Sequence, residues 1–260
     1  MQNILHERYQ EGSSPIHRLD PRVKVIVALC LITGISLTPP PHWIAYPMLW
    51  VLIGFIVELS GLNVWRVARQ AGIALPFALA AVTLLFTTPG EPLIEFGGLT
   101  ISEAGMLRFL GVLAKSWLAV QVALILAMTT PFTDLLWALG RLRVPATLIA
   151  IFSFMYRYLF TLTDEAGRLM RAREARSAAI PGQRAGGSII WRARVAGGMI
   201  GNLFLRSYER SERVYAAMLA RGYSGQMRTL DPPPLTRQAV GQGIIPVLVL
   251  ILIQILASLP

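Results

Sequence analysis

The sequence predicts an all-α membrane protein, in which a polytopic helix bundle of about five spans is interrupted by an arginine-rich cytoplasmic domain of long helices. The first observation is that 54% of the 260 residues are hydrophobic and only 15% are charged. The apolar residues form long runs, which indicates the bilayer as solvent. The second observation is that almost all of the net charge of +10 falls in residues 131–238, which hold 16 arginines against 7 acidic residues.

Five apolar stretches are candidate spans, and they lie at about residues 23–38, 43–59, 72–88, 109–130 and 240–259. Asp20-Pro21 precedes the first stretch and is a good helix start. Pro76 lies inside the third stretch, where neighbouring helices can satisfy the carbonyl group that a proline leaves free. Several stretches are shorter than the roughly 20 residues that a crossing needs, so we expect tilting or anchoring at their ends.

These stretches divide the chain into an N-terminal membrane bundle of four spans (residues 1–130), a cytoplasmic domain (131–238) and a final transmembrane helix (239–260). A segment as basic as the middle one belongs on the cytoplasmic side of a membrane. Its charge suits an acidic protein surface or anionic lipid, and the apolar runs around it make nucleic acid the least suitable partner.

The charges of the links between the spans set the orientation, because basic links stay in the cytoplasm. The N-terminus is basic, and so is the link with Arg66 and Arg69. The link after the third stretch carries Glu91, Glu95 and Glu103. We therefore expect the N-terminus in the cytoplasm and the C-terminus outside.

The cytoplasmic domain begins with a short amphipathic pattern between residues 131 and 145. Its leucines lie opposite Arg141 and Arg143, which is typical of a helix that lies along the membrane interface. Thr133 or Asp134 is the expected N-cap.

Two longer helical patterns follow in the same domain. One runs from about residue 147 to 179, and its first half (149–162) is apolar except for Arg157. The alternative that this half is a sixth span stays open. The other pattern runs from about residue 188 to 220, and Pro181-Gly182 separates the two helices.

The two long patterns end alike, in Ala175-Arg176-Ser177 and in Ala220-Arg221-Gly222. An arginine at a helix C-terminus is stabilised by the helix dipole, and its guanidinium can bind a carboxylate of another protein with two hydrogen bonds. The small neighbours let a partner backbone approach. The alternative is that Arg221-Gly222 is an ordinary C-terminal cap, with glycine in the left-handed conformation.

Several stretches of the chain resemble the transmembrane (T) component of energy-coupling-factor transporters, and specifically its cobalt-type branch. They follow the family's order from near the start of the chain to the end of the basic segment. They are Leu19-Asp20-Pro21-Arg22-Val23-Lys24, Met155-Tyr156-Arg157-Tyr158-Leu159, Thr163-Asp164-Glu165-Ala166, Ala172-Arg173-Glu174-Ala175-Arg176-Ser177 and Met218-Leu219-Ala220-Arg221-Gly222-Tyr223. Ser177 departs from the family, which often has glycine there.

The resemblance implies a non-catalytic subunit of an ATP-driven importer in the bacterial inner membrane. Such a subunit couples two ATP-binding subunits to a separate substrate-capturing membrane subunit. Its two arginine motifs dock on the ATP-binding subunits, and its crossed cytoplasmic helices transmit their closure. The implied cargo is cobalt for cobalamin biosynthesis, with nickel or a vitamin as the alternative.

The chain itself offers no ATP or metal site by sequence. A GxxxxGK[ST] phosphate loop needs a lysine after a glycine, and neither Lys24 nor Lys115 follows one. His6, His17 and His42 are scattered, without the spacing of a metal site. We therefore expect no cofactor in this chain, with ATP and the cobalt ion bound by partner subunits.

Two further hypotheses come from other classes of protein. A polytopic membrane enzyme could bind anionic lipid through the basic domain, but the only adjacent acids, Asp164-Glu165, lie among arginines that can neutralise them. A membrane scaffold would share the arginine motifs and show no dependence on an ATPase.

Overall fold

The computed structural model describes residues 9–39, 42–74, 76, 79–90, 92–96, 99–176, 188–225 and 235–258. It separates into two compact units. The bundle unit consists of Glu7–Ala138 and Pro233–Pro260, and the long-helix unit of Met1–His6 and Leu139–Pro232.

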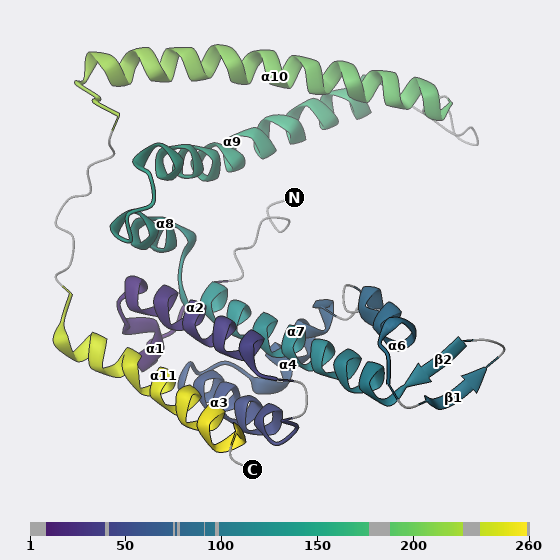
Figure 1. The fold of residues 1–260 in the computed structure, drawn as a ribbon. Helices are drawn as coiled ribbons and strands as arrows, with labels where there is room; N and C mark the ends of the chain where they lie inside the picture. Colours follow the sequence, from purple (N-terminus) through teal and green to yellow (C-terminus); the bar gives the residue numbers. More distant parts are fainter. Residues whose placement is uncertain are drawn as a thin grey trace. The chain divides into compact units, whose positions relative to one another are not determined.

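The bundle unit contains the helices predicted from the first, second, fourth and last apolar stretches. They are α2 (Pro21–Leu37), α3 (Ala45–Leu59), α7 (Glu103–Thr129) and α11 (Arg237–Ser258), with a short α1 (Pro15–Arg18) before them (Figure 1). Their shared core includes Ile35, Leu49, Ile53 and Leu118, all of which are almost completely buried.

Polar side chains start two of these helices. Asp20 caps α2, as predicted, because its carboxylate accepts a hydrogen bond from the backbone N–H of Arg22 at 2.9 Å. Ser102 caps α7 in the same way, accepting from the N–H of Gly105 at 3.0 Å. The Ser102 hydroxyl also donates to the carbonyl of Thr88 at 2.6 Å, which ties the preceding segment to the start of α7.

The third predicted span, residues 72–88, is described only in part, because residues 75, 77 and 78 lie outside the described residues. After α4 (Val64–Gln70), the described residues are 3₁₀-helical in Ala71–Ala74 and Leu79–Val82 and α-helical at Pro76 and in the short α6 (Thr83–Thr87). Pro76 is itself helical, although a proline has no N–H for the helical hydrogen bond. The continuity of this span as one helix therefore stays a prediction.

A small β-hairpin follows, which the sequence analysis did not predict. Strands β1 (Pro92–Phe96) and β2 (Leu99–Ser102) pair antiparallel, with Glu95 opposite Thr100 and Phe96 opposite Leu99. The hairpin leads directly into α7, and the other regular elements among the described residues are helices.

Three helices are long and apolar enough to cross a membrane, by length and composition, within the described part of the chain. They are Glu103–Thr129, Ala146–Arg176 and Arg237–Ala257, and Ala45–Leu59 is a shorter apolar helix. The helix that begins at Ala146 is the one that sequence analysis assigned to the cytoplasm, with its first half as a possible sixth span.

Helix α8 (Phe132–Arg141) lies at the boundary between the units. The predicted N-cap is wrong, because the helix begins at Phe132 and Thr133 and Asp134 lie inside its first turn. The carbonyl of Pro131 accepts from the N–H of Asp134 at 3.1 Å and so closes that turn. Proline without an N–H suits the start of a helix, where that donor has no partner.

The long-helix unit is dominated by α9 (Ala146–Arg176) and α10 (Ile189–Ala220), which run antiparallel to each other (Figure 1). Ser188 caps α10, and its hydroxyl accepts from the N–H of Trp191 at 3.3 Å. None of the residues of α10, all of which the structure describes, is buried, and α9 buries only Ala150 and Gly167. The unit therefore lacks a core of its own between these helices.

Candidate functional site

The two arginine motifs lie at the C-terminal ends of the two long helices. Arg176 is the last residue of α9, and it and Ala175 are exposed. Ser177 lies outside the described residues. Ala220 is the last residue of α10, and Arg221 follows as its C-cap with an exposed side chain.

Gly222 ends α10 in the left-handed conformation, with a φ angle of 78°. Its N–H donates to the carbonyl of Leu219 at 2.9 Å, and the N–H of Tyr223 donates to the carbonyl of Met218 at 3.0 Å. This is the glycine-terminated helix cap that the sequence analysis kept as an alternative. The cap holds the backbone while the Arg221 side chain stays exposed, so the same residues can both end the helix and meet a partner.

A carboxylate joins the two long helices where they cross. Glu165 of α9 accepts a hydrogen bond from the Nη1 atom of Arg206 of α10 at 2.7 Å. Arg168, one turn along α9, donates to the other oxygen of Glu165. Both oxygens are therefore neutralised by arginine, which removes Glu165 as a general acid or base and weakens the hypothesis of an enzyme.

Arg176 and Arg221, called the arginine tips below, lie on opposite sides of the point where the two helices cross. Arg176 lies 11 residues beyond Glu165 and Arg221 lies 15 residues beyond Arg206, or about 16 Å and about 22 Å at 1.5 Å per residue. Because the helices are antiparallel, the tips lie at opposite ends of the pair. The arrangement offers two separate cationic contacts from one pair of helices.

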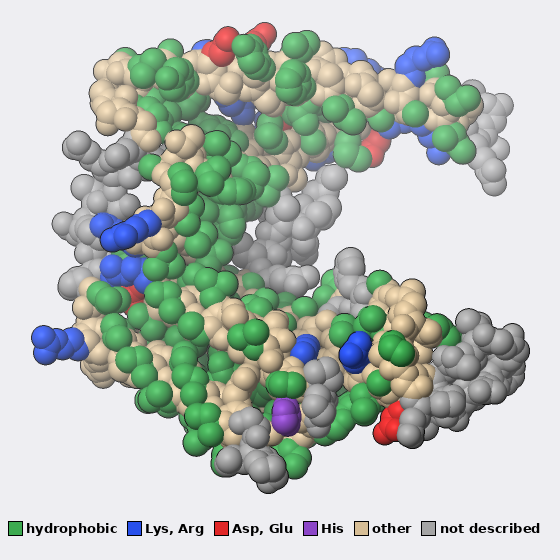
Figure 2. All heavy atoms as spheres, in the orientation of Figure 1, with side chains coloured by type: hydrophobic (Ala, Val, Ile, Leu, Met, Phe, Trp, Pro, Cys, Tyr) green, Lys and Arg blue, Asp and Glu red, His purple; other side chains and the backbone are tan. Residues whose placement is uncertain are grey.

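An apolar groove lies between the first half of α9 and the second half of α10. Its volume is about 480 Å³. Its lining includes Ile151, Phe154, Leu162, Val214 and Met218. Figure 2 shows hydrophobic side chains in green over both helices, together with blue arginine side chains. Exposed apolar surface of this extent marks a site of contact with protein or lipid.

The segment that starts α2 forms a polar junction in the bundle unit. The guanidinium of Arg22 pairs with the carboxylate of Asp20 at 2.8 Å and lies 4.8 Å from the ring centre of Trp137 in α8. Burial acts to raise the pKa of Asp20, but the hydrogen bonds and charge of Arg22 outweigh it and lower that pKa below its ordinary value of 3.8. The junction holds α8 against the start of α2.

Lys24 completes this junction from inside α2. Its ammonium group donates to the carbonyl of Thr129 at 2.9 Å and to that of His17 at 3.1 Å. A cation at the C-terminal end of α7 satisfies a free carbonyl and complements the helix dipole. The sequence analysis used this stretch for the helix start and for the resemblance, and missed its contacts with α7 and α8.

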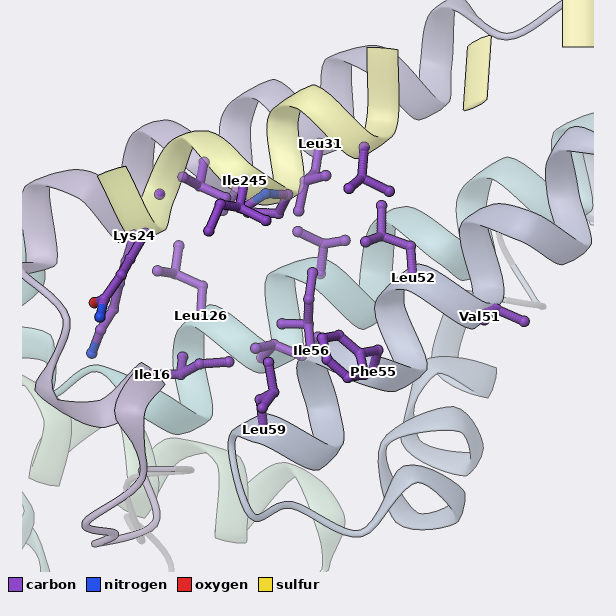
Figure 3. Close-up of a pocket in the computed structure, with 18 of the residues that line it drawn as sticks. Ile16, Lys24, Leu31, Val51, Leu52, Phe55, Ile56, Leu59, Leu126 and Ile245 are labelled. Carbon is purple, nitrogen blue, oxygen red and sulfur yellow. The ribbon is translucent and has the colours of Figure 1, made fainter. Parts of the chain in front are cut away.

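A second groove lies inside the bundle unit, with a volume of about 860 Å³ (Figure 3). Figure 3 shows apolar side chains from α2, α3, α7 and α11 around it, including Leu31, Phe55, Leu126 and Ile245, with Lys24 at one end. Such a surface is expected where helices face lipid or another membrane subunit.

Metal ligands do not gather in groups of three among the residues that the structure describes. The imidazole of His17 lies 2.7 Å from the Ser14 hydroxyl and 3.0 Å from the carbonyl of Gln10. Those contacts give His17 a structural role. The expectation that ATP and metal are bound by partner subunits stays a prediction.

The bundle and the long helices together define a helical membrane protein whose long helices expose apolar and cationic surface. The family of cobalt transport proteins named CbiQ matches residues 12–230. The energy-coupling factor transporter transmembrane protein EcfT of Thermanaerovibrio acidaminovorans is 31% identical over 88% of this chain and 86% of its own length. The EcfT proteins of Lacticaseibacillus paracasei and Staphylococcus aureus are 29% and 28% identical, over 86% and 85% of this chain and 87% and 84% of their own lengths.

The chain therefore belongs to the CbiQ family, as the transmembrane component of an energy-coupling factor transporter. The resemblance drawn from the motifs is confirmed. The protein is a membrane component of a transporter with several subunits.

Proposed function

We propose that this chain is the non-catalytic subunit that carries motion from two ATP-binding subunits to a substrate-capturing membrane subunit. The observation that supports this most strongly is the placement of Arg176 and Arg221 at exposed C-terminal helix ends, on opposite sides of one crossing. Two ends on one pair of helices suit two partners of similar shape.

The chemistry of the ends favours acidic partner surfaces. An arginine at a helix C-terminus is already stabilised by the dipole. Its guanidinium can form two parallel hydrogen bonds with a carboxylate, which fixes the orientation of the partner as well as adding affinity. Ala175, Ser177, Ala220 and Gly222 provide the small surroundings that close approach needs.

The junction at the start of α2 supports the second half of the proposal, transmission towards the membrane. Arg22 holds the first part of α8 through Trp137, and Lys24 holds the end of α7. Helix α8 leads into the long-helix unit. Movement of the long helices would therefore pull on a segment that is anchored to two membrane helices.

We propose cobalt as the cargo of the complex, because cobalt is what the matching family is described as transporting. The names of the EcfT relatives mention no cargo, so nickel and vitamins are the alternatives. On this proposal the metal and ATP are bound by other subunits. The N-terminus and the long-helix unit lie in the cytoplasm of the bacterial cell, and the C-terminus lies outside.

The test is to replace both Arg176 and Arg221 by glutamate in the complete complex. Recovery of the ATP-binding subunits with the tagged chain should fall to about a tenth of wild type or less, because two charge pairs become repulsive. Uptake should stop, while insertion into the membrane stays normal.

The matched control makes the same charge change on the same helices, with Arg171 and Arg213 replaced by glutamate. Both side chains are exposed and lie before the tips, so recovery should stay near wild type. If the tip variant retains the ATP-binding subunits as well as this control does, the arginine tips are not the docking sites.

A further inference from the structure

The carboxylate of Glu165 in α9 accepts hydrogen bonds from arginines of both long helices, Arg168 of α9 and Arg206 of α10. Only 14% of its side chain is exposed, although Arg168 and Arg206 on either side are more than half exposed. Hydrogen bonds between ionised groups are shorter and stronger than neutral ones. Two guanidinium groups on a single half-buried carboxylate therefore hold it more firmly than an isolated surface pair would.

The surroundings of this contact make it mechanically important. No residue of α10, which is described throughout, is buried, and α9 buries only two, so apolar packing does little to fix the angle between the helices. On one side of Glu165 the apolar groove of about 480 Å³ leaves space between them. Without a specific contact, the two helices could close into that groove or slide along each other.

We propose that Glu165 is a positioning residue, which pins α9 to α10 through Arg206 and so fixes how far apart the two arginine tips are held. This inference rests on the proposed function, because it assigns the pin a part in passing motion from one tip to the other. A pinned pair turns as one body when a partner pushes on either end. Without the contact between Glu165 and Arg206, a force on one helix changes the crossing angle and is not transmitted to the other helix.

The first test uses uptake and ATPase recovery in the complete complex. Arg206→Glu places two carboxylates opposite each other, and uptake should fall about five-fold or more. Recovery of the ATP-binding subunits should stay near wild type, because the tips are unchanged. Exchanging the charges, with Glu165→Arg and Arg206→Glu together, should restore most of the uptake. A merely destabilising substitution would not be repaired in this way.

Arg213→Glu is the matched control. It makes the same charge change two turns further along α10, where Arg213 lies 4.0 Å from Glu209 in an exposed pair. Uptake should stay near wild type. The proposal is wrong if uptake with Arg206→Glu equals uptake with this control. It is also wrong if the exchanged pair gives no more uptake than Arg206→Glu alone.

The second test measures the pin without any partner. Spin labels at Ala172 and Ala217, both exposed, report the distance between the two helices after Cys30 is replaced by serine. The distance distribution should be narrow in the wild-type sequence, broad with Arg206→Glu and narrow again in the exchanged pair. Distance distributions of equal width in all three proteins would show that Glu165 and Arg206 do not fix the angle between the helices. If the wild-type chain recovers no ATP-binding subunit, the proposed function is wrong. The distance measurement needs no partner, so it still tests the contact between Glu165 and Arg206.

Discussion

At the scale of single residues, two glycines explain how the first and last membrane helices approach each other. A Cβ atom on Gly34 of α2 would collide with the side chain of Leu250, and one on Gly243 of α11 would collide with Val23. Gln254 adds a polar contact across the same interface, to Thr38 at 3.1 Å. Small residues that let helices pack closely are the usual basis of helix association in membranes.

Replacing Gly243 by alanine should therefore lower the free energy of unfolding by about 1–3 kcal/mol, because the stiff side chain of Val23 cannot move aside without strain. Thermal unfolding of the purified chain in mild detergent is the measurement. Gly241→Ala is the control, since the space around a Cβ atom there is open, and it should leave the midpoint unchanged or slightly raised. Equal midpoints for the two variants would contradict the close packing.

Local residue roles could be predicted from the sequence, and distant ones could not. Asp20 as a helix cap and Gly222 as a helix end depend on neighbours within a few positions, and both are present in the structure. The contact of Lys24 with Thr129 joins positions 105 residues apart. The type of charge does not show which distant carbonyl or carboxylate a cationic side chain will bind. The contact between Glu165 and Arg206 therefore could not be predicted either.

At the scale of elements, hydropathy located four of the predicted membrane helices. The helices from Pro21, Ala45, Glu103 and Arg237 lie where apolar runs predicted them. The predicted span at residues 72–88 is described only in part, with 3₁₀ geometry in Ala71–Ala74 and Leu79–Val82, so its continuity stays a prediction. The β-hairpin was missed because its two strands are only five and four residues long.

The length and composition of α9 fit a membrane span, but we expect the helix in the cytoplasm. Two observations favour the cytoplasm. Its first half lines a groove with Ser207, Arg210 and Ser211 of the arginine-rich α10, and Arg157 in the middle of that half would be costly in hydrocarbon.

A reporter fused near Gln183 should therefore be found in the cytoplasm, and one fused at the C-terminus outside the cell. The measurement is the activity of paired reporters that work on only one side of the membrane. If the first half of α9 crosses the bilayer, both locations reverse, and the orientation proposed above is wrong.

At the scale of the whole molecule, the two units differ in how they bury apolar residues. The bundle unit buries its own core between α2, α3, α7 and α11, as a membrane anchor must. In the long-helix unit, α9 fully buries only two residues and α10 none, and the two helices end at the exposed Arg176 and Arg221. Exposed apolar surface marks a site of contact, which agrees with the membership of a transporter with several subunits.

The central claim is that both arginine tips lie against ATP-binding subunits in the assembled transporter. The most direct measurement is to place a photo-crosslinking amino acid at position 176, at position 221 or, as a control, at position 213, irradiate the intact complex in membranes and identify the adducts by mass spectrometry. Positions 176 and 221 should each give an adduct with an ATP-binding subunit, and position 213 should give far less. Adducts with lipid alone, or none from either tip while the complex is intact, would contradict the account.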